Sequence, residues 1–227
     1  MIGTNRSPIL AWPGWRHLCF SWWLTVLVTA WFALVFAGAI SFTASHPTRV
    51  RVHLDAELQI PLVPGFIIFY LSIYLLFAAI PFVLRTRREV TSLALAQCLA
   101  IGLAAICFLL IPAQLAYAPP TGLDVWQGTF RFADAMNLDY NLVPSLHVAL
   151  SFICIECFAA HRELVGKALL RNWGMLIAAS TVLTHQHHLL DVLSGGLLAA
   201  GSLWLGRRIE KLWAPSEIST PPASYSA

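Results

Sequence analysis

Two short segments of the chain carry residue types that could perform nucleophilic and acid–base chemistry. Residues 141–147 are Asn-Leu-Val-Pro-Ser-Leu-His, and residues 180–191 are Ser-Thr-Val-Leu-Thr-His-Gln-His-His-Leu-Leu-Asp. Both adjoin strongly apolar stretches, where ionisable groups cost free energy and are therefore functional candidates. We expect the two segments to form one site.

The spacing of His187 and Asp191 suits an activated imidazole. Residues four apart share one face of a helix, so the carboxylate of Asp191 could reach the His187 ring. A carboxylate in that position fixes the tautomer and raises the nucleophilicity of the opposite ring nitrogen.

Each segment also leads into a predicted helix, which suits the binding of an anion. Pro144 is tolerated in a first helical turn, because its missing N–H would be unpaired there anyway. The unpaired N–H groups and the positive dipole end of a helix start attract negative charge. Two such starts facing each other would form an anion site with His147 at its edge.

The composition indicates which elements hold these segments. Of 227 residues, 58% are hydrophobic and only 11% are charged, whereas soluble domains carry about 25% charged residues. The composition therefore excludes an ordinary soluble protein, a disordered chain and a nucleic-acid binder. It predicts an all-α membrane bundle.

We predict six membrane-spanning helices between the charged segments. The fifth is the weakest, because the apolar run from Trp173 to Thr184 would extend only ~18 Å as a helix. Either Lys167 and Arg171 reach the surface from a longer helix, or its far end stops inside the protein. The predicted spans are 18–42, 61–84, 90–112, 145–160, 172–186 and 188–206.

The distribution of positive charge predicts the orientation. With the N-terminus in the cytoplasm, all of the 14 Lys and Arg residues except Arg49, Arg51 and Arg131 lie on the cytoplasmic side. The positive-inside rule then favours both termini in the cytoplasm. We expect a multi-pass protein of the plasma membrane, or of a bacterial inner membrane, with both polar segments facing the outside or the periplasm.

This topology divides the chain into three segments. Residues 1–17 would be a cytoplasmic N-terminus, residues 18–206 a single six-span domain, and residues 207–227 a disordered cytoplasmic tail. The first span resembles a signal peptide, but its apolar run of about 25 residues is longer than the roughly 7–15 apolar residues of such peptides.

The polar segments resemble motifs of the type 2 phosphatidic acid phosphatase superfamily, in the branch that includes inositol phosphorylceramide synthases. The second family motif, Pro-Ser-x-His, is matched by residues 144–147. The third, Ser-Arg-x5-His-x3-Asp, is matched by Ser180, His187 and Asp191, with Thr181 in place of the arginine.

The first family motif, Lys-x6-Arg-Pro, is degenerate in this chain. Its place would be residues 111–120, where prolines are kept and the basic residues are not. The resemblance covers residues 60–206 and implies that the third to sixth helices carry the site.

The resemblance implies a metal-independent histidine phosphatase or phosphotransferase that acts on lipid phosphates. In such an enzyme His187 attacks phosphorus to form a phosphohistidine, and Asp191 orients His187. His147 protonates the leaving oxygen and then activates water, while Ser145 and Ser180 contact the phosphate. No metal, cofactor or nucleic acid is expected, and the partners are a lipid phosphate substrate and membrane lipids.

The expected reaction is hydrolysis of a phosphomonoester or diphosphate of a lipid. The same histidine could instead transfer a phosphoryl-headgroup to a lipid or polyol acceptor. A third interpretation is an inactive protein that binds lipid phosphates, because phosphoryl transfer depends on positive charge and two family cations are missing.

Other residues could replace those cations. Arg131 is the only basic residue of the third connecting segment, and it could bind phosphate or be a solvated interfacial anchor. His185 could bind phosphate if protonated. Asn141 could contact phosphate or cap the fourth helix.

Two interpretations from other classes remain open. Residues 185–188, His-Gln-His-His, resemble the histidine boxes of membrane di-iron oxygenases, although the chain has a single dense box. Six spans could also form a transporter or channel, but no inverted repeat or ladder of charges supports this.

Overall fold

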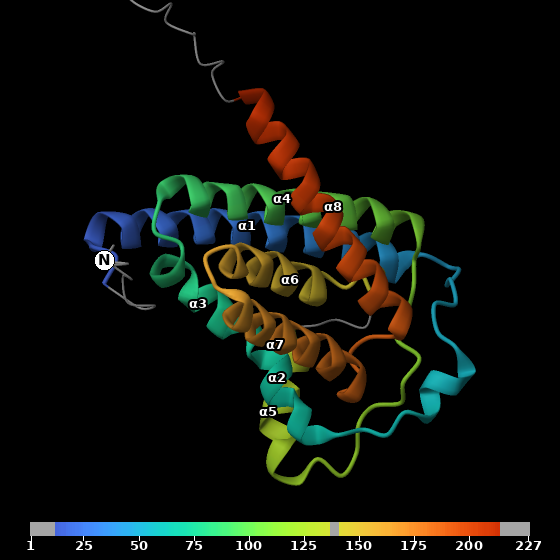
Figure 1. The fold of residues 1–227 in the computed structure, drawn as a ribbon. Coiled ribbons are helices and arrows are strands. Elements are labelled where there is room, and N and C mark those ends of the chain that lie inside the picture. Colours follow the sequence, from blue (N-terminus) through green and yellow to red (C-terminus); the bar gives the residue numbers. More distant parts are fainter. Residues whose placement is uncertain (1–11, 137–140, 214–227) are drawn as a thin grey trace, which may run out of the picture.

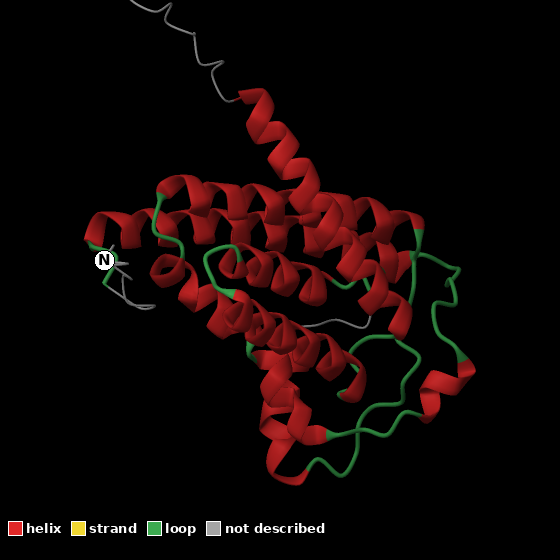
Figure 2. Ribbon diagram, viewed as in Figure 1, coloured by secondary structure: helices red, strands yellow, loops and turns green. Residues whose placement is uncertain are grey.

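The computed structural model describes residues 12–136 and 141–213. These residues form helices joined by loops, with no strand among them (Figure 2). The elements in chain order, with η for a 3-10 helix, are α1 (Trp15–Ser45), η1 (Asp55–Gln59), η2 (Pro64–Phe66), α2 (Ile67–Leu71), α3 (Ile73–Val83), α4 (Arg87–Leu110), η3 (Asp124–Trp126), α5 (Gln127–Met136), α6 (Leu146–Ala159), α7 (Leu164–Leu183) and α8 (Leu189–Trp213).

Helices lie at all six predicted span positions, and the all-α prediction is confirmed. Among the described residues, four segments are long and apolar enough to cross a membrane, namely α1, the run Pro64–Val83, α4 and α8. The 14 residues of α6 are apolar but would extend only ~21 Å. The 20 residues of α7 include two basic side chains. The described residues therefore have the helices of a membrane protein, with four clear candidate spans.

Two helix boundaries differ from the prediction by more than three residues. α7 begins at Leu164 rather than near residue 172, because Arg171 is accommodated on the helix by pairing with Glu156 at 2.8 Å. α8 continues to Trp213, so residues 207–213 of the predicted tail are helical. The rest of that tail, 214–227, and residues 1–11 of the predicted N-terminus lie outside the described residues.

Helix α5, which lies between the third and fourth predicted spans, was not predicted from the sequence. Its ten residues are amphipathic, with Phe130 and Ala133 buried beside Ile67 and Tyr70 while Arg131 is exposed. The short apolar face of α5 was hidden in the sequence because it is interrupted by polar residues at every turn.

Helix α6 lies at the centre of the bundle, between α4 and α7 (Figure 1). It packs against α3, α4, α7 and α8, and most of its residues are buried. A helix that is apolar on all sides is stable only when it is enclosed in this way. Buried alanines of α4, among them Ala96, Ala100 and Ala104, provide a smooth surface for close helix packing.

The starts of α6 and α8 meet at one end of the bundle. A Cβ atom on Gly195 of α8 would lie 2.6 Å from the carbonyl oxygen of Ser145, so only glycine allows this approach. The Ser145 amide donates a hydrogen bond to the Asp191 carbonyl at 3.0 Å. The loops that follow α1 and α4 gather at the same end (Figure 1). The fold thus brings the two polar segments of the sequence together.

Candidate active site

An apolar cavity of about 400 Å³ opens among α1, α3, α4 and α6, and His147 and His187 both line it. The other lining side chains are predominantly aromatic and aliphatic. They include Phe32, Phe36, Phe77, Ile101 and Leu150. The two imidazoles predicted to share a site therefore border one cavity.

His147 lies in the first turn of α6 and is held by Tyr70. The two rings stack with their centroids 4.0 Å apart. The Nε2 atom of His147 lies 2.9 Å from the Tyr70 carbonyl oxygen, which can only accept a hydrogen bond. In the neutral ring Nε2 therefore carries the proton, and Nδ1 is the nitrogen left to exchange one.

His187 lies in the turn between α7 and α8 and is 4% exposed. Its Nδ1 atom lies 3.3 Å from Oδ2 of Asp191. The expectation that both residues share one helix is wrong, because α8 begins only at Leu189. The contact forms because Asp191 lies in the first turn of α8 and the preceding turn folds back. The opposite nitrogen of His187, Nε2, remains for chemistry.

The turn that carries His187 is fixed by backbone hydrogen bonds to Thr181. The Thr181 carbonyl accepts from the amides of Gln186 at 2.9 Å and His187 at 3.0 Å. His185 has a positive φ of 58°, which reverses the chain. The Thr181 hydroxyl donates to Ala178 within α7. Thr181, at the position of the family arginine, therefore shapes the turn through its backbone.

Asp191 connects the nucleophile candidate to the surrounding backbone. Its carboxylate is fully buried, and Oδ2 also accepts from the His188 amide at 2.8 Å. Its carbonyl receives the Ser145 amide from the start of α6. One residue thus holds His187 and both helix starts in register.

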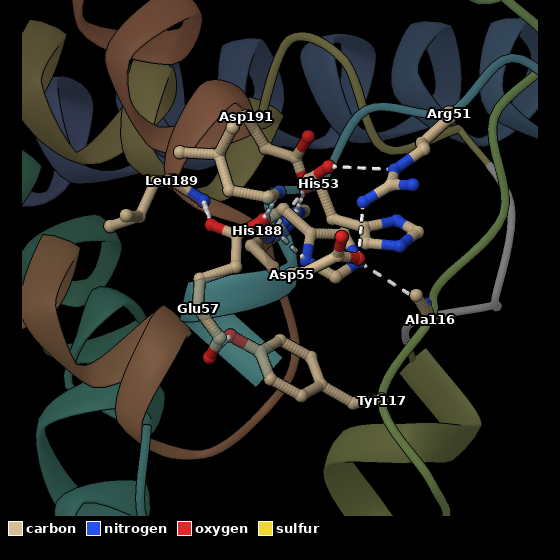
Figure 3. Close-up of polar contacts among 11 residues, drawn as sticks. Arg51, His53, Asp55, Glu57, Ala116, Tyr117, His188, Leu189 and Asp191 are labelled. Carbon is tan, nitrogen blue, oxygen red and sulfur yellow. Dashed lines mark hydrogen bonds and ion pairs between the residues drawn. The ribbon is translucent and has the colours of Figure 1, made fainter. Parts of the chain in front are cut away.

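A second buried carboxylate, Glu57 in η1, supports this arrangement from the loop after α1 (Figure 3). It is 3% exposed, and its Oε2 accepts from the Leu189 amide at 2.9 Å. Its Oε1 accepts from the Leu54 amide at 2.8 Å and lies 3.2 Å from Nδ1 of His188. Glu57 was not predicted from the sequence, because an acid in a polar loop has no distinctive spacing.

His188 and Tyr117 complete the network (Figure 3). The Nε2 atom of His188 accepts a hydrogen bond from the Ala116 amide at 3.1 Å, so it carries no proton. Burial lowers the pKa of His188, in agreement with a neutral ring. The Tyr117 hydroxyl donates to the Glu57 carbonyl at 3.2 Å. Burial, with the charges of Glu57 and Asp191, raises the pKa of Tyr117 to about 12.

Two candidate phosphate ligands are committed to other contacts. The His185 ring stacks on Tyr117 at 4.1 Å, and its Nε2 lies 2.9 Å from the Ile60 carbonyl oxygen. The Ser180 hydroxyl donates to Ile177 within α7 at 2.6 Å and is fully buried. Neither residue lines the cavity.

Ser145, and not Asn141, caps the start of α6. Asn141 lines the cavity but bonds to α1, accepting from the Thr43 hydroxyl at 3.2 Å and donating to the Phe36 carbonyl at 3.1 Å. Ser145 is the residue that caps α6, because its Oγ accepts from the Val148 amide at 3.3 Å. The alternative that Asn141 caps the helix is therefore wrong.

Positive charge is sparse around the two histidines. Arg131 is exposed on α5, and among the described residues no Lys or Arg lines the cavity. Nor do the described residues contain a group of three or more His, Cys, Asp or Glu side chains that could hold a metal ion. The site of the described chain is thus built on imidazoles, carboxylates and helix starts.

The described residues thus form an all-helical bundle with apolar helices, and two histidines border one of its cavities. A family model of the PAP2 superfamily matches residues 39–205, and the chain belongs to that superfamily. This match confirms the predicted resemblance and supports a phosphatase- or phosphotransferase-type activity. Searches of curated proteins and of solved structures returned no match.

Proposed function

We propose that this protein is an integral membrane lipid phosphatase that hydrolyses a phosphomonoester or diphosphate of a lipid. The observation that carries the proposal is that His147 and His187 border one apolar cavity. The cavity suits the hydrocarbon part of a lipid, while the imidazoles suit its phosphate.

In the proposed first step, Nε2 of His187 attacks phosphorus and the bond to the lipid oxygen breaks. His147, protonated on both nitrogens at this point, gives its Nδ1 proton to that oxygen, which leaves as the lipid alcohol from a phosphomonoester or as the lipid phosphate from a diphosphate. Asp191, through Nδ1, stabilises the charged phosphohistidine and keeps Nε2 directed at phosphorus. In the second step His147 takes a proton from water, the water oxygen attacks phosphorus, and the bond to His187 breaks to release phosphate.

The phosphate oxygens would be held chiefly by the start of α6. The first amides of that helix, of Leu146 and His147, have no acceptor within the helix and are available to an incoming anion. Ser145 accepts a hydrogen bond through Oγ and keeps its own proton to donate. These donors would do part of the work of the missing family cations.

The proposed membrane arrangement has six spans, both termini in the cytoplasm, and the histidines toward the outside of a plasma or bacterial inner membrane. His161, after α6, lies 3.6 Å from Glu89 at the start of α4, so these helix ends share one end of the bundle. That end carries many of the basic residues, whereas His147 and His187 lie at the other end. This division of charge supports the orientation.

The direct test is the purified protein in detergent with phosphatidate, comparing His187→Ala with the control His161→Ala. We expect His187→Ala to lower phosphate release at least about 1000-fold. His161 is exposed and outside the cavity, so its variant should retain activity. Unchanged phosphate release by His187→Ala would refute the proposal.

A substrate panel distinguishes hydrolysis from transfer. Phosphatidate, phosphatidylglycerophosphate, polyprenyl diphosphate, and ceramide with phosphatidylinositol would be supplied, with released phosphate and new lipids both measured. We expect released phosphate, and we expect it to persist in excess chelator. A new phospholipid formed without release of inorganic phosphate would identify a transferase. Binding of a lipid phosphate without either product would identify an inactive lipid-phosphate binder.

A further inference from the structure

A second, larger cavity lies at the far end of the molecule from His147 and His187. It has a volume of about 680 Å³ and opens among α6, α7 and α8. Its basic lining residue Arg207 follows Asp191 by 16 positions on α8, a separation of ~24 Å along the helix. The cavity is therefore distinct from the proposed active site.

The mouth of this cavity carries a surplus of positive charge. Arg171 is neutralised by Glu156, to which its guanidinium donates two hydrogen bonds of 2.8 Å. The other three cations, Arg207, Arg208 and Lys211, lie within two turns of α8. Across the described residues, none of these three has a salt bridge within 4.0 Å. Such a mouth attracts an anion.

The floor of the same cavity is apolar. It is formed by small residues of α8, including Gly196 and Ala200, facing Phe152 of α6. The distance along α8 from Gly196 to Arg207 is ~16 Å. Trp204, which also lines the cavity, lies beneath the Arg208 guanidinium at 5.3 Å and joins the apolar floor to the charged mouth.

We propose that this groove binds an anionic phospholipid, with its phosphate at Arg207, Arg208 and Lys211 and one acyl chain along α8. Charge complementarity selects an anion, and the apolar floor selects a molecule with a hydrocarbon chain. Basic pockets between membrane helices bind acidic headgroups in this way. The lipid is a resident ligand of the bundle, and its binding does not depend on the proposed reaction.

The test is native mass spectrometry of the full chain, delipidated in detergent and titrated with phosphatidylglycerol or phosphatidylcholine. The triple variant Arg207→Gln/Arg208→Gln/Lys211→Gln should bind phosphatidylglycerol at least about tenfold more weakly. The matched control is Arg16→Gln/Arg87→Gln/Arg88→Gln, which removes three exposed cations at the starts of α1 and α4. It should change the affinity less than about twofold. Equal losses in both variants would overturn the proposal.

A second variant separates a lipid from free phosphate. Ala200→Trp fills the floor and leaves the three cations in place, so we expect it to weaken phosphatidylglycerol binding at least about threefold. Phosphatidylcholine should bind weakly to every variant. If inorganic phosphate displaces the lipid and Ala200→Trp has no effect, the groove is a simple anion site and the proposal is wrong.

Discussion

The two ends of α8 differ in how their charged side chains are buried and paired. At its start, Asp191 is fully buried. Its Oδ2 contacts His187 and accepts from the His188 amide, and its carbonyl accepts from the Ser145 amide. At its other end, Arg207 and Arg208 are exposed and have no salt bridge among the described residues. The start of α8 therefore holds its neighbours in fixed positions, and its other end presents exposed positive charge.

The buried carboxylate of Asp191 positions neighbouring groups, whereas the exposed cations at the other end of α8 attract an anion. A buried charge is costly, and it is tolerated when hydrogen bonds hold it in one place. Such fixed groups stabilise a transition state without reorganising during the reaction. Exposed cations on long side chains are mobile and screened, so they suit the capture of a headgroup but not the alignment of a nucleophile.

Among the variants that follow, the largest effect on activity is expected from His147→Gln, at the end of the bundle where α8 begins. The variant should lower hydrolysis of phosphatidate about 100- to 10,000-fold, because the alkoxide leaving group needs a proton. The first turnover of p-nitrophenyl phosphate should slow much less, since nitrophenolate leaves without a proton. The rates of the first turnover with both substrates measure this, and equal losses would contradict the role of His147 as an acid.

A smaller effect is expected from Glu57→Gln, which tests whether the Glu57 carboxylate supports the start of α8. The amide retains one acceptor oxygen where the carboxylate now accepts from the Leu54 and Leu189 amides. We expect the free energy of unfolding to fall by about 2 kcal/mol and kcat to fall with little change in KM.

The matched control for Glu57→Gln is Asp55→Asn in the same 3-10 helix. Asp55 is exposed and pairs with Arg51 on the surface, so its loss should be within about 1 kcal/mol. Thermal unfolding in detergent measures both variants. If the two variants are equally stable, Glu57 does not hold the loop onto α8.

A pH titration probes the neutral state of His188. Burial holds its pKa below the ordinary 6.5, so the unfolded chain binds a proton at a higher pH than the folded chain does. The free energy of unfolding should therefore fall as pH drops below about 6.5, by at most about 1.4 kcal/mol per pH unit. His188→Gln should flatten this slope, whereas the exposed His161→Gln should not. An unchanged slope in His188→Gln would show that another group is responsible.

The smallest effect is expected from Arg131→Gln. Arg131 is exposed on α5 and does not line the cavity, so kcat/KM should change less than about threefold. A loss of about 100-fold or more, measured with phosphatidate, would instead show that this cation reaches the phosphate.

The sequence predicted the helices better than the turns that hold the site. Charge breaks and apolar runs located six helices, because these features depend only on local composition. The contact between His187 and Asp191 was predicted from spacing, although a turn and not one helix forms it. The roles of Ser180 and His185 in phosphate binding could not be judged, since hydropathy does not say which way a side chain points.

Long-range contacts were beyond prediction from the sequence. Glu57 meets Leu189 and His188 across more than 130 positions of the chain. No periodicity connects these residues, and their proximity follows from how the loop after α1 folds over the start of α8. Short α5 was missed for a related reason, because its burial depends on α2 and not on its own composition.

The most direct measurement is the trapping of a covalent intermediate on the full-length protein. His147→Gln should slow the attack of water but not the departure of nitrophenolate, so brief exposure to 32P-labelled p-nitrophenyl phosphate followed by alkaline denaturation should leave an acid-labile phosphohistidine. We expect peptide mapping to place the label on His187, and we expect no label in His187→Ala/His147→Gln. A label on another residue, or one that persists in the double variant, would contradict a nucleophilic His187.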